Sequence, residues 1–482
     1  MIGEEVLFLP IREIGAHLRA KRLAAVALAE MSLRRLEALG PRLGAVVTVA
    51  RERALAQAHR ANQELLAGKD RGPLHGIPYG AKDLLATRGL PTTWGAEPFR
   101  QQVFDFDATV VRRLEEAGAV LVAKLAMVEL AGGLGYDNPD ASFTGPGRTP
   151  WNPEHWSGGS SSGSAAAVAA GLVAFAIGSE TSGSILGPAA CCGVTGLRPT
   201  YGLVSRHGAM ALSWTLDKIG PLARTADDCA LVLAAIAGHD PEDPTTGVGF
   251  SYRENPAKRG RPGPRFRVGV LRHATVDTDP DVESRFREAL ATLREAADLE
   301  DDVALPDLPY REAVGVIIDA EGGAAFRDLI ESGRVKQLRN PADRVGGFAM
   351  LMTPAADYLD AMRARVAMRR ELDLLLSRYD AVVAPARSRL APPIGKDFDT
   401  PPVSAADAPR PPALTQAGNL AGLPAVAVPI GFGRGRLPAS LQLLGRAHSE
   451  ETLVAIAAAY QEMTDWHRQS PDPRGARVDP GH

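Results

Sequence analysis

The sequence contains little cysteine and no long apolar run. Its 482 residues include three cysteines, Cys191, Cys192 and Cys229, and no Cys-x-x-Cys pair. This usage favours a reducing compartment with buried structural thiols. No apolar run reaches the ~20 residues that span a bilayer, and the N-terminus, with Glu4 and Glu5, lacks the basic-then-apolar pattern of a signal peptide. We therefore expect a cytoplasmic protein that does not contact membranes.

The sequence also lacks an excess of either charge. Its formal net charge is −3 at pH 7, which gives no argument for nucleic acid or acidic membranes as partners. The one dense basic run, 258–267, is rich in Pro and Gly and is expected to be a solvated loop before a strand at 268–271. The ten histidines show no metal-ligand spacing, and no P-loop or Rossmann glycine pattern follows a strand. We expect no metal and no cofactor.

Length and composition indicate a globular α/β protein. Hydrophobic residues make up 45% and charged residues 23% of the chain, as in an ordinary soluble protein with one large domain or two or three smaller ones. The alternation of strand and helix patterns predicts a mostly parallel or mixed sheet with helices on both faces. The expected elements are helices at 26–39 and 50–66, a strand at 76–82, a helix at 107–116, a strand at 119–123, a long irregular stretch at 131–163, a helix at 164–170, a strand at 172–177, a turn at 179–183, a helix-like segment from 184 interrupted at 187–188, helical residues at 340–375, a Pro-rich loop at 400–412, strands at 423–430 and 438–444, and a polar tail after 470.

Three separated segments carry the groups of a serine hydrolase that uses no histidine. Lys82 ends the apolar, Gly-rich run 76–82, Ser160 lies in the serine-rich turn 158–164, and Ser184 follows it by 24 residues in a second serine-rich turn. Alone, a lysine after a strand is usually a solvated charge and a Gly/Ser segment is usually only a turn. Their combination in this order and spacing indicates a functional site.

Another serine motif competes with this interpretation. Gly159–Gly163 fits the G-x-S-x-G nucleophile elbow with Ser161 as the nucleophile, but that motif needs a buried strand directly before it. The preceding residues, 151–156, have the composition of a loop, whereas Ser184 follows a predicted strand. We therefore reject the α/β-hydrolase interpretation. A Ser-x-x-Lys motif of the β-lactamase type is absent.

The pattern resembles the amidase signature family, whose catalytic triad is Ser, cis-Ser and Lys. The resemblance runs from about residue 8 to residue 470 and includes Gly196–Thr200, Tyr379–Pro385, Asn419–Pro424 and Leu441–Gly445. It implies a single amidase domain over 1–482, of the α/β class, with a twisted mixed β-sheet core layered with α-helices. Within it we expect N-terminal helices at 8–70, the signature catalytic core at 71–225, a C-terminal part at 226–470 and a loose tail at 471–482.

The resemblance implies a role for each member of the triad. Ser184 matches the acyl-forming nucleophile, Ser160 the cis-serine that relays the proton, and Lys82 the base; the Gly159–Ser160 bond matches the family's cis peptide. A lysine base must be neutral near pH 7, which requires desolvation. Ser160 suits the relay because a hydroxyl both donates and accepts.

Amide hydrolysis also needs donors for the oxyanion. Successive N–H groups at Thr181, Ser182, Gly183 and Ser184 can form a concave donor site, and Gly183 lets the backbone approach the substrate closely. Ala131 falls where some family members place another backbone contact to the substrate. The acyl-pocket residues are expected from the 131–156 loop and the C-terminal half of the chain.

The chain departs from the family near the nucleophile. Many members have Asp at position 180 and Arg at position 186, where this chain has Glu180 and Leu186. The missing Arg argues against the branch that serves as the A subunit of glutamyl-tRNA amidotransferase. Our first hypothesis is therefore an amidase that hydrolyses a small-molecule amide to acid and amine through a Ser184 ester, alone or as a homodimer. The alternatives are that A subunit, which needs partner subunits, and an inactive scaffold protein.

Overall fold

A computed structural model describes residues 3–135, 137–252, 265–397 and 411–471. Most of the expected basic loop at 258–267, most of the Pro-rich loop at 400–412 and nearly all of the tail after 470 lie outside these residues. In the described part of the chain one 11-stranded sheet runs through the molecule, in the order β1-β3-β2-β4-β6-β5-β10-β11-β9-β7-β8. The strands are β1 (Val46–Val49), β2 (Pro78–Lys82), β3 (Val120–Leu125), β4 (Phe175–Glu180), β5 (Thr195–Arg198), β6 (Lys218–Ala223), β7 (Phe266–Leu271), β8 (Ala297–Val303), β9 (Ala381–Pro385), β10 (Ala425–Phe432) and β11 (Pro438–Leu444).

The sheet is mixed, as expected. Strand β2 lies parallel to β3 and β4, whereas β4 and β6 are antiparallel. Strands β7 to β11 are neighbours at one end of the sheet, in the order β10-β11-β9-β7-β8, and β1 lies at the other end. Because a single sheet spans both halves of the chain, the protein forms one α/β domain. The expected subdivision within that domain stays a prediction.

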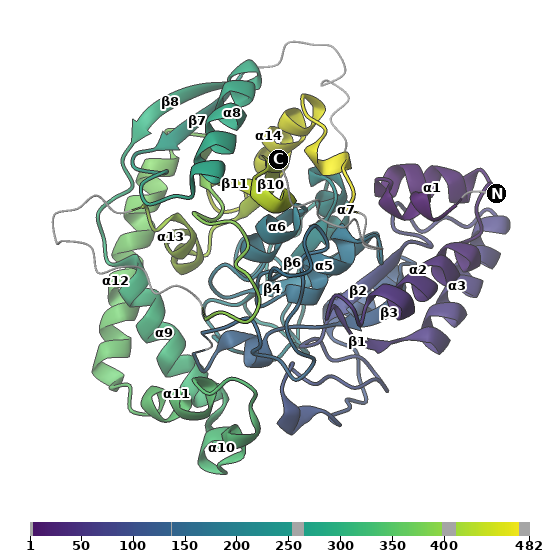
Figure 1. Ribbon diagram of the computed structural model, residues 1–482, viewed down its shortest axis with the longest axis horizontal. Helices are drawn as coiled ribbons and strands as arrows, with labels where there is room; N and C mark the ends of the chain where they lie inside the picture. Colours follow the sequence, from purple (N-terminus) through teal and green to yellow (C-terminus); the bar gives the residue numbers. More distant parts are fainter. Residues whose placement is uncertain (1–2, 136, 253–264, 398–410, 472–482) are drawn as a thin grey trace.

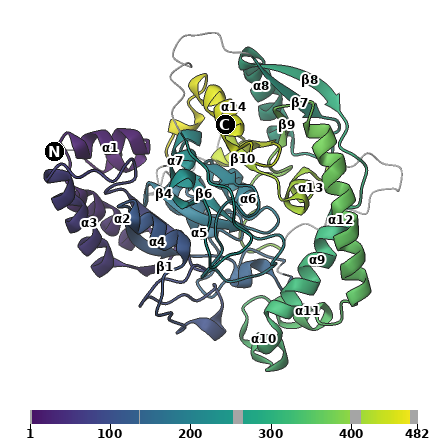
Figure 2. The ribbon, with the colours of Figure 1, turned by 180° about the vertical axis from the view of Figure 1, so that it is seen from behind.

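Helices cover both faces of this sheet (Figures 1 and 2). Successive residues of β10 show the two faces: Val426 and Val428 enter one hydrophobic cluster, while Ala425 and Ala427 enter another. The helices are α1 (Ile11–Arg19), α2 (Ala25–Leu39), α3 (Arg51–Leu66), α4 (Thr109–Glu116), α5 (Ser162–Ala169), α6 (Leu186–Cys192), α7 (Ala226–Ile236), α8 (Pro280–Ala296), α9 (Tyr310–Ala325), α10 (Arg327–Glu331), α11 (Asp343–Met350), α12 (Ala355–Leu376), α13 (Leu414–Ala421) and α14 (Glu450–Glu462).

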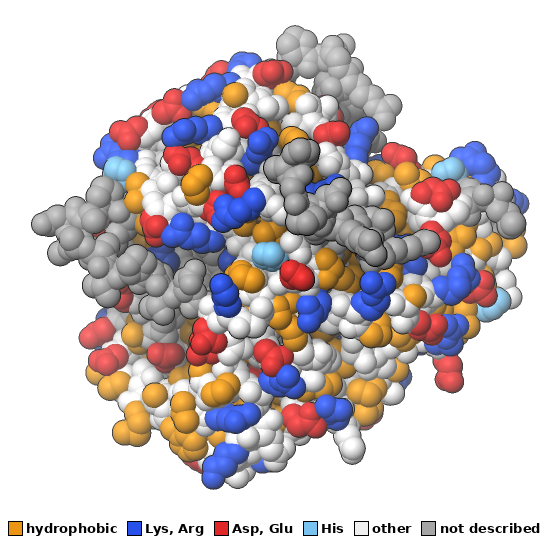
Figure 3. All heavy atoms as spheres, in the orientation of Figure 1, with side chains coloured by type: hydrophobic (Ala, Val, Ile, Leu, Met, Phe, Trp, Pro, Cys, Tyr) orange, Lys and Arg blue, Asp and Glu red, His pale blue; other side chains and the backbone are white. Residues whose placement is uncertain are grey.

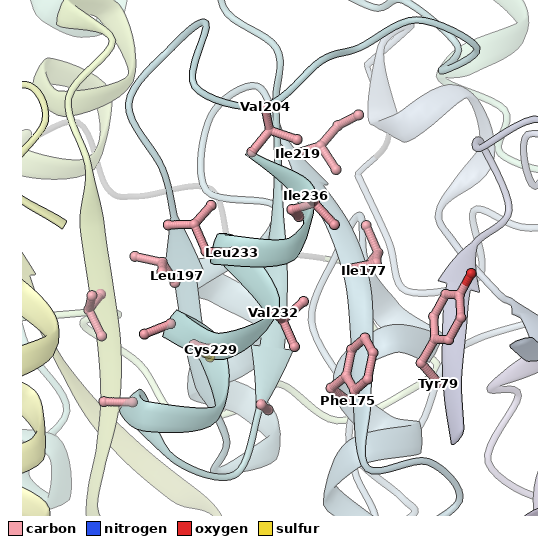
Figure 4. Packing of buried hydrophobic residues seen from close by; sticks show 14 of the residues in the cluster. Tyr79, Phe175, Ile177, Leu197, Val204, Ile219, Cys229, Val232, Leu233 and Ile236 are labelled. Carbon is pink, nitrogen blue, oxygen red and sulfur yellow. The ribbon is translucent and has the colours of Figure 1, made fainter. Parts of the chain in front are cut away.

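The core beside the site packs helix α7 against the middle strands. Figure 4 shows Cys229, Val232 and Leu233 of α7 directed toward the sheet. On the strand side, the rings of Tyr79 and Phe175 stack with their centroids 5.2 Å apart. These two side chains are register partners on the paired strands β2 and β4, which end at the candidate site, and their stacking stabilises that pairing.

The surface mixes charges of both signs. In the view of Figure 3, Lys and Arg side chains alternate with Asp and Glu side chains, without a large area of one sign. This distribution fits the small net charge of the chain. Among the described residues, no helix combines the length and apolarity that crossing a membrane requires.

Several expected boundaries are wrong by a few residues. The strand expected at 172–177 is β4, at 175–180, because Leu172 still closes helix α5: its N–H donates to the Ala167 carbonyl (2.9 Å). The Gly187-Pro188 pair does not interrupt a helix but lies in the first turn of α6, where a missing N–H costs nothing. Residues 340–375 form two helices, α11 and α12, separated before Pro354.

Candidate active site

The first feature of the site is a hydrogen bond between a buried amine and a buried hydroxyl. Strands β2 and β4 run parallel, so their carboxyl ends meet at one edge of the sheet, where open α/β folds bind ligands. Lys82, the last residue of β2, is fully buried and its Nζ donates to Ser160 Oγ (2.8 Å). It also donates to Ser179 Oγ (2.9 Å). The structure thus brings together the predicted Lys82 and Ser160.

Burial sets the ionisation of this lysine. Desolvation lowers the pKa of Lys82 to about 7, against the opposing influence of the negative charges of Asp217 and Glu180. The neutral amine is therefore well populated at neutral pH, as the sequence predicted for a lysine base. No sequence signal indicated Ser179, the second partner of Nζ, because it was expected in a turn, whereas it lies in β4.

Ser160 lies in a turn that contacts the Ser184 segment. The Gly159–Ser160 peptide is cis, as the resemblance implied. The following N–H, of Ser161, donates to the Ser184 carbonyl (3.3 Å). The Ser161 hydroxyl is buried and bonds to the backbone of Ser179, so this serine is held as part of the core and not presented as the elbow motif would require.

Ser184 lies at the wall of a cavity. The cavity has a volume of ≈ 640 Å³ and its lining includes Ser184 with Ser182, Gly183 and Ala131. Gly183 has φ +96°, a backbone region that other residues rarely adopt. The turn between β4 and α6 therefore borders open space, and a role of its backbone N–H groups as an oxyanion site stays a prediction.

Ala131 and Thr181 contact this space in different ways. Ala131 lines the cavity, but its N–H donates to the Val128 carbonyl (3.0 Å). A backbone contact from Ala131 to a substrate would therefore use its carbonyl oxygen. The Thr181 hydroxyl donates to Asp217 Oδ1 (2.6 Å), which leaves its backbone as the part available to a substrate.

A buried carboxylate fixes the turn that carries Ser184. Glu180 Oε2 accepts from the N–H groups of Ile185 (2.8 Å) and Leu186 (3.0 Å), at the start of α6. Its Oε1 accepts from Arg198 Nη1 (2.9 Å) and from Asn419 Nδ2 (2.8 Å). Although burial opposes it, the Arg198 charge and these hydrogen bonds hold the pKa of Glu180 below its usual value. Glu180 thus has a cationic partner, Arg198 of β5, although position 186 carries no Arg.

The two cysteines near Ser184 do not contribute to the site. Cys191 and Cys192 are buried in α6, and burial raises the pKa of both thiols. Cys192 Sγ donates to the Ser157 carbonyl (3.4 Å). A buried, protonated thiol is a poor nucleophile, which supports the predicted structural role. The described residues contain no group of three or more His, Cys, Asp or Glu side chains placed to hold a metal ion.

The family comparison identifies the class of protein as an amide C–N hydrolase. The model of the Amidase family matches residues 27–454, so the chain belongs to the amidase signature family. It is 40% identical over 477 residues to the A subunit of the glutamyl-tRNA(Gln) amidotransferase of Roseiflexus sp. (strain RS-1), covering 93% of this chain and 95% of that protein.

Solved structures of the same family superpose closely. A chain from a structure described as a vestigial protein complex that reveals the evolutionary origins of an s-triazine catabolic enzyme matches with a TM-score of 0.86 and 31% identity over 94% of this chain and 98% of that one. The peptide amidase from Stenotrophomonas maltophilia matches with a TM-score of 0.81 and 32% identity over 97% and 99%. The chain is therefore an amidase-type enzyme.

The depressed pKa of Lys82 makes stability depend on pH. Between pH about 7 and 10.5 the unfolded chain holds a proton on Lys82 that the folded chain lacks, so the contribution of Lys82 to the free energy of unfolding, taken as the difference between the wild type and Lys82→Met, should rise with pH by up to ~1.4 kcal/mol per pH unit. Lys82→Met keeps the apolar stem and removes this contribution. We expect the variant to be nearly inactive and at least as stable as the wild type at pH 7, measured by urea unfolding across this range. A strong destabilisation at pH 7 would instead identify Lys82 as a charged structural group.

The buried Glu180–Arg198 pair should be far more important for stability than an exposed pair. Arg198→Met leaves a buried carboxylate without its cation and should lower the free energy of unfolding by about 3–5 kcal/mol. The matched control is Arg446→Met, which breaks the half-exposed pair with Asp373 (2.9 Å) and should cost less than about 1 kcal/mol. Equal losses in the two variants, measured by urea unfolding at pH 7, would contradict this role of the pair.

Proposed function

We propose that the protein hydrolyses a carboxylic amide to the acid and an amine or ammonia through an ester on Ser184. The observation that carries this proposal is the buried hydrogen bond between Lys82 Nζ and Ser160 Oγ (2.8 Å). The next residue, Ser161, donates its N–H to the Ser184 carbonyl. Lys82 and Ser160 supply a neutral base and a relay hydroxyl beside a serine that faces a cavity.

In the proposed reaction, Ser160 relays a proton from Ser184 to Lys82, and Lys82 later gives a proton back by the same relay. Lys82 Nζ takes the proton of Ser160 as Ser160 Oγ takes that of Ser184, and Ser184 Oγ attacks the amide carbon. The oxyanion is stabilised by N–H groups of the 181–184 turn. Lys82 then returns the proton through Ser160 to the departing nitrogen, the C–N bond breaks, and water hydrolyses the ester by the same route in reverse. Ser179 acts as a positioning residue, because its hydrogen bond directs the amine toward Ser160.

A second candidate function is the A subunit of a glutamyl-tRNA amidotransferase. It is favoured by similarity of 36–40% over 93–97% of this chain to proteins of that name. The missing Arg at position 186 argues against this branch, although Glu180 is still paired with a cation, Arg198. Co-purification of the expressed chain with a tRNA-binding partner supports this candidate; hydrolysis of amides by the isolated chain supports the first.

The proposal is tested most directly by covalent labelling. An uncharged fluorophosphonate should react with Ser184 and leave Ser160 and Ser161 unmodified, as read by peptide mapping. Ser184→Ala should lose turnover by ~10³-fold or more in a panel of aliphatic, aryl and peptide amides, with an unchanged circular dichroism spectrum. Labelling at Ser161 would support the nucleophile elbow that we rejected.

A further inference from the structure

The charged side chains of the described residues that line the cavity at Ser184 are all positive. The described lining of this cavity contains three charged side chains, Arg311, Arg387 and Arg389, and no Asp or Glu. A substrate with a free ammonium group would find no carboxylate there to accept its protons. The lining instead favours a substrate with a negative charge.

The three arginines differ in exposure and in their ion-pair and hydrogen-bond partners. Arg389 Nη2 pairs with Asp277 Oδ1 (2.7 Å) and its side chain is half-exposed. Arg311 is exposed, on the first turn of α9. Arg387 is half-buried, forms no hydrogen bond or ion pair with any described residue, and its Nε is buried without a partner. Leaving a charged donor buried and unpaired is costly unless a ligand completes it.

Arg387 is also held firmly toward the nucleophile segment. It lies just after the end of β9, between Ala386, whose N–H donates to the Ser440 carbonyl (2.8 Å), and Ser388, whose carbonyl accepts from the Asp279 N–H (2.8 Å). Its Nη1 approaches Gly187, at 3.8 Å from the position that a Cβ would take there. Gly187 is the third residue after Ser184 and lines the same cavity. The guanidinium therefore lies beside the segment that carries the reacting serine.

We propose that the substrate of this enzyme is an amide that carries a carboxylate, and that Arg387 binds that carboxylate while the amide carbon lies at Ser184. This inference rests on the proposed function, since it presumes that Ser184 is the reacting group. A planar guanidinium binds a carboxylate through two parallel N–H···O bonds, and Arg387, which lines the cavity, forms no such bond with a described residue. Arg387 thus acts as a specificity-determining residue and not as a part of the proton relay.

Protection of Ser184 from labelling tests the inference without knowledge of the natural substrate. The wild-type chain reacts with the uncharged fluorophosphonate in the presence of the linear dicarboxylates from malonate to suberate, or of their diamides, which are neutral and nearly isosteric. We expect the best dicarboxylate to protect at a concentration at least ~10-fold below that of its diamide. Because the contact is ionic, this advantage should fall as salt is raised.

Two variants locate the contact. Arg387→Gln should raise the protecting concentration of the dicarboxylate ~10–100-fold, relative to its own labelling rate without ligand. Arg389→Gln removes the same charge from the same short segment of chain, but from a side chain that is already paired with Asp277, and should change protection by less than about threefold. With the monoamides of these dicarboxylates as substrates, Arg387→Gln should raise KM and Arg389→Gln should leave it nearly unchanged. With the neutral diamides as substrates, neither variant should change KM much.

The outcomes separate the two proposals. If Ser184 is not labelled, the proposed function falls and this inference falls with it. If Ser184 is labelled but dicarboxylates protect no better than diamides, or protection survives in Arg387→Gln, only the carboxylate inference is overturned. Should Arg387→Gln fail to fold, the dicarboxylate-to-diamide ratio of the wild type and its salt dependence decide the question.

Discussion

The site depends on the desolvation of one lysine without a contacting carboxylate. Lys82 and Lys124 are equally buried on neighbouring strands, β2 and β3. Lys124 Nζ lies 3.0 Å from Asp83 Oδ1, so it forms a buried ion pair. Lys82 instead contacts two hydroxyls, of Ser160 and Ser179. Burial lowers the pKa of both amines, but Lys124 has a contacting carboxylate that opposes this effect, whereas Lys82 has two hydroxyls as partners.

The buried Glu180 explains why a departure from the family pattern is compatible with the fold. A carboxylate at the start of α6 satisfies two backbone N–H groups of the turn that bears Ser184, and it needs one cation for neutrality. Any guanidinium that reaches Oε1 fulfils that need, and Arg198 reaches it from β5. Leu186 is then free to pack in the core, where it is buried. Glu180 therefore stays paired in the core although position 186 carries no Arg.

Local patterns predicted the α/β class and the mixed sheet, because strand and helix periodicity and the Gly/Ser turns are encoded in neighbouring residues. They did not predict the order of the strands in the sheet. Lys82 and Ser160 could be paired because the resemblance links their motifs. Nothing local predicted Arg198 as the partner of Glu180 or Arg387 as part of the cavity, since both depend on strands that meet only in the folded sheet. Helices α7, α8, α9 and α14 were also missed, because tertiary packing supports them as much as their own sequence does.

A second cavity shows how the loop before β6 connects substrate binding to the base. This cavity, of ≈ 650 Å³, is largely apolar, with Trp94, Phe104 and Phe106 in its lining, and it shares Ala131, Thr181 and Leu212 with the cavity that holds Arg387. The boundary is fixed by Asp217, which accepts from the Thr181 hydroxyl and from the N–H groups of Leu212 and Ser213. The same carboxylate raises the pKa of Lys82 against the effect of burial. Asp217 thus both lines the second cavity and raises the proton affinity of the Lys82 amine, so a change at Asp217 should affect the shape of that cavity and the pKa of Lys82 together.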